Sequence, residues 1–221
     1  MVIFTYLIAI LVILIGLPTL WLLLTARGSH GNKFVYLTFD DGPDPKVTPH
    51  ILALLKKYKV KATFFVMGKK VKKYPNLIKA IVKDGHELGN HSFSHPTNLG
   101  VYLPWKIWDE YLRCEREINK ITNKKPTFAR FPQGTAAIYG LFVLKQLGYK
   151  PINWSVEAKD WEKKVGKNLI ERRIISKARP GSVILLHDGL DSDIGTQMKV
   201  AEALPKILET FKKKNFQFST L

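Results

Sequence analysis

The chain has only one cysteine, Cys114, among its 221 residues, so no intrachain disulfide can stabilise it. Acidic residues are also scarce, with 18 Asp and Glu against 35 Lys and Arg. This balance favours an anionic partner, either an acidic wall polymer, a lipid surface or nucleic acid, although a Lys-rich solvated surface would give the same composition. The sequence contains no nucleic-acid-binding motif, so specific nucleic-acid binding is not predicted.

Charge is missing altogether from residues 1–26. Roughly 20 apolar helical residues suffice to cross a bilayer, and Tyr6 and Trp21 lie near the ends of this stretch, where aromatic side chains favour the interface. A cleaved signal peptide is the alternative, but the apolar run is longer than an h-region and no basic n-region precedes it. We therefore predict a transmembrane anchor at 1–26, a short tether at 27–33 and one domain at 34–221.

Within 34–221, apolar or β-branched runs alternate with segments of helical period. The predicted strands are 34–39, 62–67, 86–90, 127–131, 151–156, 182–187 and 216–221, and the predicted helices are 47–58, 69–84, 104–122, 136–147, 167–178 and 196–213. This order favours parallel strands with crossover helices, in an open sheet or a barrel. Pro75 is expected to split the second helix. In the third helix, the face carrying Trp105, Trp108, Leu112, Glu115 and Ile118 is expected to be buried.

Polar residues stand at the ends of five of these strands. They are Asp40 and Asp41, His91 and His95, Arg130, Asp160 with the adjacent Trp161, and His187. Catalytic groups collect at the C-terminal ends of parallel strands in both an open sheet and a barrel. The pattern therefore predicts one site at a shared rim.

The spacing of His91 and His95 places both imidazoles on one side of a helical turn. With one carboxylate they form a two-histidine, one-carboxylate set, which leaves positions on a metal open. Two capping or core histidines are the alternative, but the neighbouring Asp pair favours the metal. A hydrolytic site needs one carboxylate on the metal and a second to take a proton from the attacking water, which we assign to Asp41 and Asp40. His187 is placed to protonate a leaving group.

The motifs TFDDGP (38–43), HSFSH (91–95), RFPQG (130–134), EAKDW (157–161) and LLHD (185–188) occur in this order. With them, residues 34–221 resemble the polysaccharide deacetylase family, also called the NodB homology domain or carbohydrate esterase family 4. The resemblance implies a distorted (β/α) barrel of about seven strands. The predicted architecture is thus an α/β barrel preceded by one N-terminal transmembrane helix.

The resemblance also implies a role for each site residue. Asp41, His91 and His95 would bind a divalent metal, usually zinc, and Asp40 would be the general base, held by Arg130. Asp160 would orient His187, the general acid, and Trp161 and Leu185 would form the walls of a pocket for the acetyl methyl group.

Two positions depart from the family pattern. Gln133 replaces a common tyrosine. The resemblance implies that the backbone N–H at this position helps to stabilise the oxyanion, and a side-chain change leaves that donor in place. The groove wall loses an aromatic face, so a different sugar contact or substrate preference is expected. Glu157 replaces an aspartate. Neither change affects the expected metal ligands or the acid–base pair.

The predicted function is a membrane-anchored, metal-dependent hydrolase that removes N-acetyl groups from a GlcNAc-type cell-envelope glycan, with peptidoglycan favoured. Chitooligosaccharides, lipid-linked glycans, O-acetyl groups and a non-catalytic glycan-binding domain are the alternatives. Arg27 and Lys33 alone would keep the domain in the cytoplasm. The family mostly acts outside it, so we expect a single-pass cell-membrane protein with an extracellular catalytic domain.

Overall fold

The structure is a computed structural model that describes residues 2–28, 33–189 and 194–221. In these residues the strands form one parallel sheet in the order β5-β4-β3-β2-β1-β7-β6, and β8 pairs with β1. The strands are β1 (Phe34–Gly42), β2 (Thr63–Val66), β3 (Glu87–Asn90), β4 (Phe128–Ala129), β5 (Lys150–Pro151), β6 (Val156–Glu157), β7 (Val183–His187) and β8 (Gln217–Phe218). β1 and β7 are neighbours in this sheet and are buried along almost their whole length, as expected for parallel strands covered on both faces.

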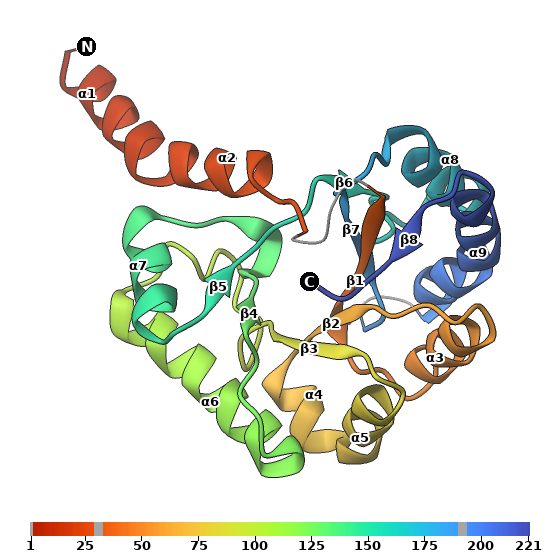
Figure 1. The fold of residues 1–221 in the computed structure, drawn as a ribbon. Helices are drawn as coiled ribbons and strands as arrows, with labels where there is room; N and C mark the ends of the chain where they lie inside the picture. Colours follow the sequence, from red (N-terminus) through yellow and green to blue (C-terminus); the bar gives the residue numbers. More distant parts are fainter. Residues whose placement is uncertain (1, 29–32, 190–193) are drawn as a thin grey trace.

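Helices cover the outside of this curled sheet (Figure 1). They are α3 (Thr48–Lys57), α4 (Gly68–Lys73), α5 (Pro75–Lys83), α6 (Pro104–Thr122), α7 (Ile138–Gln146), α8 (Lys167–Lys177) and α9 (Ile194–Lys213), with a short 3₁₀-helix η2 (Pro132–Gly134) after β4. Pro75 begins α5 and separates it from α4, so the predicted split is confirmed. The parallel α/β architecture, curled into a partial barrel, is also confirmed.

The strand predicted at 151–156 is wrong, because it consists of two short strands at opposite ends of the sheet. β5 pairs with β4, whereas β6 pairs with β7. Between them, the guanidinium of Arg130 donates hydrogen bonds to the carbonyl groups of Ile152 (3.2 Å) and Asn153 (3.0 Å). Arg130 therefore takes two acceptors that a continuous strand would use in its ladder, and the chain crosses from one end of the sheet to the other.

The predicted buried face of α6 is also largely wrong. Trp105 and Trp108 are 64% and 41% exposed, whereas the buried residues of the helix are Ile107, Tyr111, Cys114 and Ile118. Both sets satisfy steps of three and four, so the period alone does not choose between them. The choice is made by close packing on α4, where a Cβ on Gly68 would lie 2.9 Å from the Cα of Cys114.

The apolar N-terminal segment forms three consecutive elements, α1 (Val2–Leu11), a π-helix η1 (Val12–Gly16) and α2 (Leu17–Leu24). Figure 1 shows α1 leaving the body of the barrel, while α2 stays against it. Leu22 is 2% exposed and lies in the same buried cluster as Val143 and Leu144 of α7. None of the helices in the described residues is long and apolar enough to cross a membrane. The transmembrane anchor stays a prediction.

The predicted tether is described only at its two ends, because residues 29–32 lie outside the described ranges. At its start, Arg27 forms an isolated bridge with Ser182, and the N–H of Gly28 donates to the carbonyl of Gly181 (3.2 Å). A Cβ on Gly28 would lie 1.9 Å from the ring of Tyr36, so only glycine fits this approach. The start of the tether is therefore held against the domain.

Candidate active site

Asp40 and Asp41 lie at the C-terminal end of β1 and are both buried. Asp40 is paired in register with His187 of β7. Asp41 has a φ of 67°, a left-handed conformation that is rare outside glycine and that turns its side chain toward the same pocket as Asp40. At the next position, a Cβ on Gly42 would lie 2.2 Å from the carboxylate of Asp188. This local geometry explains how two adjacent carboxylates reach one site.

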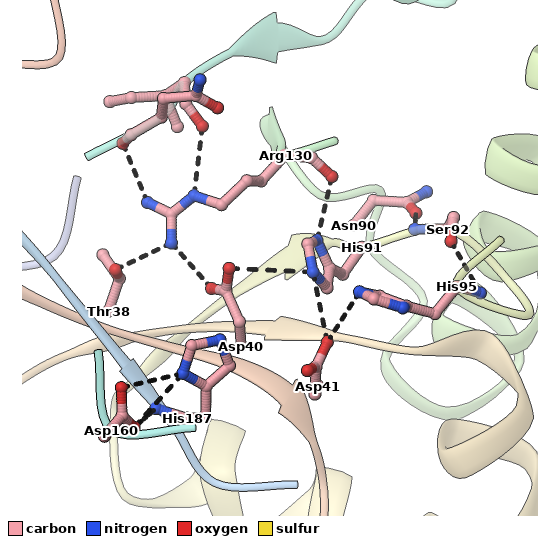
Figure 2. Close-up of polar contacts among 12 residues, drawn as sticks. Thr38, Asp40, Asp41, Asn90, His91, Ser92, His95, Arg130, Asp160 and His187 are labelled. Carbon is pink, nitrogen blue, oxygen red and sulfur yellow. Dashed lines mark hydrogen bonds and ion pairs between the residues drawn. The ribbon is translucent and has the colours of Figure 1, made fainter. Parts of the chain in front are cut away.

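Two imidazoles approach the carboxylate of Asp41 (Figure 2). Its Oδ1 lies 3.3 Å from Nε2 of His91 and 3.2 Å from Nε2 of His95. Ligand atoms of these three residues all lie within 4.8 Å of one another. The Nδ1 of His91 is 2.9 Å from the carbonyl oxygen of Arg130, and a proton shared there leaves Nε2 free as an electron-pair donor.

These three residues fit a divalent cation. The buried Oδ1 of Asp41 faces the two imidazole nitrogens. Burial would raise the pKa of Asp41, but the hydrogen bond and charge of His91, with the charges of His187 and His95, hold it well below its usual range. Burial, helped by the charge of His91, lowers the pKa of His95 and favours its neutral form. An ionised carboxylate and imidazole nitrogens are the donors that zinc prefers.

Arg130 fixes the second carboxylate from behind. Its Nη1 donates hydrogen bonds to Oδ1 of Asp40 (2.7 Å) and to the hydroxyl of Thr38 (2.8 Å). The guanidinium is fully buried and stacks over the ring of Phe65 at 4.0 Å. Such a charge-assisted contact leaves Oδ2 of Asp40 on the side of His91, 3.7 Å from its Nε2. Asp40 is therefore a buried carboxylate with one oxygen held and the other facing the site.

His187 is held by Asp160 in the same way. Nδ1 of His187 lies 3.1 Å from Oδ1 of Asp160, and the backbone N–H of His187 donates to Oδ2 (2.9 Å). Burial would lower the pKa of His187, but the carboxylate of Asp160 and, more weakly, those of Asp41 and Asp40 raise it to about 9. The ring is therefore protonated at neutral pH and can donate a proton from Nε2. Trp161 packs edge-on against it at 5.3 Å.

The predicted residues meet at one pocket of about 480 Å³. Asp40, Asp41, His91, His95, Gln133, Trp161, Leu185 and His187 line it, together with Trp154 and Glu157. Arg130 and Asp160 lie behind this surface, where they contact Asp40 and His187. Sequence reasoning missed Trp154 because it assigned that residue to the interior of a strand.

Two supporting contacts were also missed. The carboxylate of Glu110, on α6, accepts hydrogen bonds from the backbone N–H groups of Phe93 (3.0 Å) and Ser94 (2.7 Å) and from the Ser94 hydroxyl (2.8 Å). It therefore fixes the loop that carries both histidines. Gln133 has a φ of 59°, and its side-chain Oε1 accepts from the N–H of Asn98 (3.2 Å). No sequence motif marks either contact.

A parallel α/β barrel with a carboxylate–imidazole rim of this kind defines a hydrolase site with a metal-binding position. A sequence model described as polysaccharide deacetylase matches residues 27–152. The chain belongs to this family, as its motifs predicted.

Proteins of known name are similar to it. A peptidoglycan-N-acetylglucosamine deacetylase of Bacillus cereus is 37% identical, covering 88% of this chain and 69% of its own. A chitooligosaccharide deacetylase of Azorhizobium caulinodans is 37% identical, with shares of 76% and 80%. The peptidoglycan-N-acetylmuramic acid deacetylase PdaA of Bacillus subtilis is 38% identical, with shares of 88% and 72%. A crystal structure of the Bc1960 peptidoglycan N-acetylglucosamine deacetylase superimposes with a TM-score of 0.82 at 36% identity, covering 88% of this chain and 89% of that one.

Proposed function

We propose that this chain is a metal-dependent hydrolase that removes N-acetyl groups from GlcNAc-type sugars of a cell-envelope glycan. The observation that carries this proposal is the pair of buried contacts on the two sides of one pocket, Arg130 with Asp40 and Asp160 with His187. One contact holds a carboxylate able to accept a proton, and the other holds a protonated imidazole able to donate one. Hydrolysis of an amide needs both.

The chain's own residues can carry each proton. Oδ2 of Asp40 accepts a proton from the attacking water as the water oxygen bonds to the acetyl carbonyl carbon. The carbon–nitrogen bond then breaks, and Nε2 of His187 donates its proton to the departing sugar amine. The products are acetate and a free amino sugar. Trp161 and Leu185 provide an apolar wall beside His187 that suits the acetyl methyl group.

We propose zinc as the metal, held by Asp41, His91 and His95, because one carboxylate and two imidazoles form a common catalytic zinc set. When bound, the cation would act as a Lewis acid and favour ionisation of water near neutral pH. The held orientation of His91 and the loop fixed by Glu110 keep this donor set in place.

Peptidoglycan is the substrate we favour, because two of the similar proteins are named peptidoglycan deacetylases. A third is named a chitooligosaccharide deacetylase, so chitooligosaccharides are the second candidate. Gln133 lines the pocket with an amide in place of the aromatic ring expected from the family pattern. Its amide adds hydrogen-bonding groups and removes a stacking face, so the sugar contact at this position should differ from that of a tyrosine-bearing enzyme.

We further propose that the N-terminal segment anchors the protein in the cell membrane, with the catalytic domain outside the cytoplasm. Residues 1–26 carry no charge, and α1 extends away from the barrel (Figure 1). Many apolar side chains of this segment are exposed, among them Phe4, Ile13 and Trp21. Such a surface is unfavourable in water and favourable in lipid.

Acetate release by the 221-residue chain in detergent tests the reaction. Acetylated peptidoglycan and N-acetylglucosamine oligomers would be compared before and after chelation, and again after addition of zinc, cobalt or magnesium. We expect release that disappears with chelator and returns with zinc. The better substrate would rank the two glycans.

Asp40→Asn should keep metal and fold but lose activity, while Lys83→Gln, on the exposed end of α5, should match the parent protein. No acetate from any substrate, with metal bound and the fold intact, would contradict catalysis. In that case glycan binding measured without turnover would support a non-catalytic domain.

A further inference from the structure

The direction of α2 relative to the barrel can be read from its contacts at both ends. Near its start, the Thr19 hydroxyl donates to the carbonyl of Ala136 (3.2 Å) and accepts from its N–H (3.1 Å). Ala136 follows η2, which carries Gln133 at the pocket. Beyond the end of α2, Arg27 pairs with Ser182, directly before β7 begins. α2 therefore runs from the catalytic end of the barrel to the opposite end.

η1 and α1 precede α2, so they join it on the side of Ala136, near the catalytic end. Figure 1 shows α1 continuing away from the barrel body beyond α2. The N-terminal segment thus meets the barrel near the end that carries the mouth of the catalytic pocket.

That end also exposes apolar side chains, which we call the apolar rim: Leu103, Trp105, Ile138 and Phe142. Each is more than half exposed. Leu103 and Trp105 lie at the start of α6, and Ile138 and Phe142 share one face of the first turns of α7. The two helix starts are adjacent, because the preceding residues Gly100 and Ala136 form a bridge. A cluster of this kind on a soluble surface marks an interaction site.

The rim continues onto the N-terminal segment. Leu22 of α2 packs into the cluster that contains Val143 and Leu144 of α7, so the two helices are neighbours. The outer side of α2 exposes Leu17, Leu20 and Trp21. The apolar rim is therefore next to the surface that the anchor offers to lipid.

Exposed lysines accompany the rim at the catalytic end. Lys159, Lys163 and Lys164 lie on the loop after β6, and Lys106 is on the first turn of α6. Two nearby acids form ion pairs, Asp109 with Arg113 and Glu162 with Arg173. Cations beside apolar and Trp side chains match the interface of an anionic bilayer, where each lysine adds attraction to the lipid phosphates.

We infer that the catalytic end of the barrel docks on an anionic bilayer through the apolar rim and these lysines, so that the pocket opens toward glycan held close to the membrane surface. The inference rests on the anchoring proposed above. An aromatic platform for a soluble glycan chain is the competing use of the rim. Leu103 and Ile138 argue against it, because aliphatic side chains give no ring face for sugar stacking, whereas both suit lipid.

The test places an environment-sensitive fluorophore on single cysteines of the 221-residue chain. Cys114 is buried, so introduced surface cysteines can be labelled selectively. Ile138→Cys and Trp105→Cys report on the rim, Phe4→Cys reports on the anchor, and Lys83→Cys, at the opposite end of the barrel, is the matched control. The protein is reconstituted into phosphatidylcholine vesicles with or without about 30 mol % phosphatidylglycerol, and with doxyl-labelled lipid as quencher.

We expect blue-shifted, quenchable emission from both rim probes and from Phe4→Cys, and none from Lys83→Cys. Quenching at the rim should be stronger with phosphatidylglycerol and should weaken in a Lys163→Gln/Lys164→Gln background. A quenched anchor probe with rim probes that match Lys83→Cys would overturn the docking and leave the anchor standing. An unquenched anchor probe would overturn both. Rim probes that respond to soluble N-acetylglucosamine oligomers instead of lipid would identify a glycan platform.

Deacetylation of soluble oligomers in detergent separates these outcomes from a failure of the proposed reaction. Ile138→Cys lies outside the pocket and should retain the parent rate there. If Ile138→Cys keeps the parent rate while its probe is not quenched by lipid, the docking is wrong and the proposed reaction stands.

Discussion

Replacing Asp160 with asparagine removes the charge that holds His187 protonated while keeping a side chain of the same size. The carboxylate of Asp160 is the main cause that raises the pKa of His187 to about 9, against the burial that lowers it. At that pKa about 97% of the imidazole is protonated at about pH 7.5, whereas at the ordinary 6.5 only about 9% would be. Without the carboxylate, burial should move the pKa to 6.5 or below. Acetate release at pH 7.5 should therefore fall about tenfold or more.

The assay is the pH dependence of kcat on N-acetylglucosamine oligomers with saturating metal. The parent protein should keep its rate at neutral pH, where the raised pKa holds the imidazole protonated, and lose it only in the alkaline range as His187 deprotonates. In Asp160→Asn this alkaline limb should move to about pH 6.5 or lower, with most of the rate recovered in mild acid. Asp160→Glu is the conservative control, because it restores a carboxylate and should move the limb back upward.

Stability gives a second readout of the same charge pair. The folded pKa of His187 is raised above its unfolded value, so the pair stabilises the fold fully below about pH 6.5 and loses this contribution as the pH rises through about 9. The Tm of the parent protein should fall across that window relative to Asp160→Asn. An alkaline limb at the same pH in both proteins, with the metal content equal, would refute the assignment of His187 as the group that donates the proton.

Three further predictions follow from single contacts. Asp41→Asn removes the charged oxygen at the histidine pair and should weaken zinc binding by more than about 100-fold in a calorimetric titration. That loss is larger than the one expected for a residue that only supports a metal ligand. Unchanged affinity would contradict the ligand set. Leu22→Ala should destabilise the fold by about 2–4 kcal/mol in thermal unfolding, whereas Leu24→Ala, at a 71% exposed position, should change it by less than about 0.5 kcal/mol; equal effects would mean that α2 does not pack on the barrel in solution. Gly42→Ala should lower both Tm and activity, because its Cβ would lie 2.2 Å from the Asp188 carboxylate, and a parent-like protein would show that the turn has room.

The site was more predictable than the sheet because its residues stand at strand ends. Parallel topology brings the C-terminal ends of neighbouring strands together whatever their exact bounds, so Asp40 and His187 were expected to share a rim before any register was known. The structure pairs them directly. The contacts of Arg130 with Ile152 and Asn153 were not predictable, because they depend on where a buried guanidinium ends after the barrel has formed. Those contacts divide the strand that the local pattern made continuous.

In two helical segments, the apolar pattern did not identify the face that packs on the barrel. Trp105 and Trp108 were expected to be buried because apolar spacing along α6 was taken as contact with the core, but Ile107 and Tyr111 on another face meet the same criterion and are the ones covered. Along 1–26 every helix face is apolar, so the sequence does not show which face packs on the barrel. In the structure the face of α2 that carries Leu22 packs there.

The packing of α2 on the barrel determines how the N-terminal segment is oriented relative to the exposed apolar residues of α6. A segment free to move on a tether would leave the orientation of the pocket relative to the membrane unset. With Thr19 held by Ala136 and Arg27 by Ser182, the direction of the N-terminal segment is fixed relative to the pocket. The side chains exposed at the catalytic end are then on the side from which the segment emerges. The proposed orientation on a bilayer therefore depends on the packing of α2, and Leu22→Ala should lower both the stability and the rim quenching.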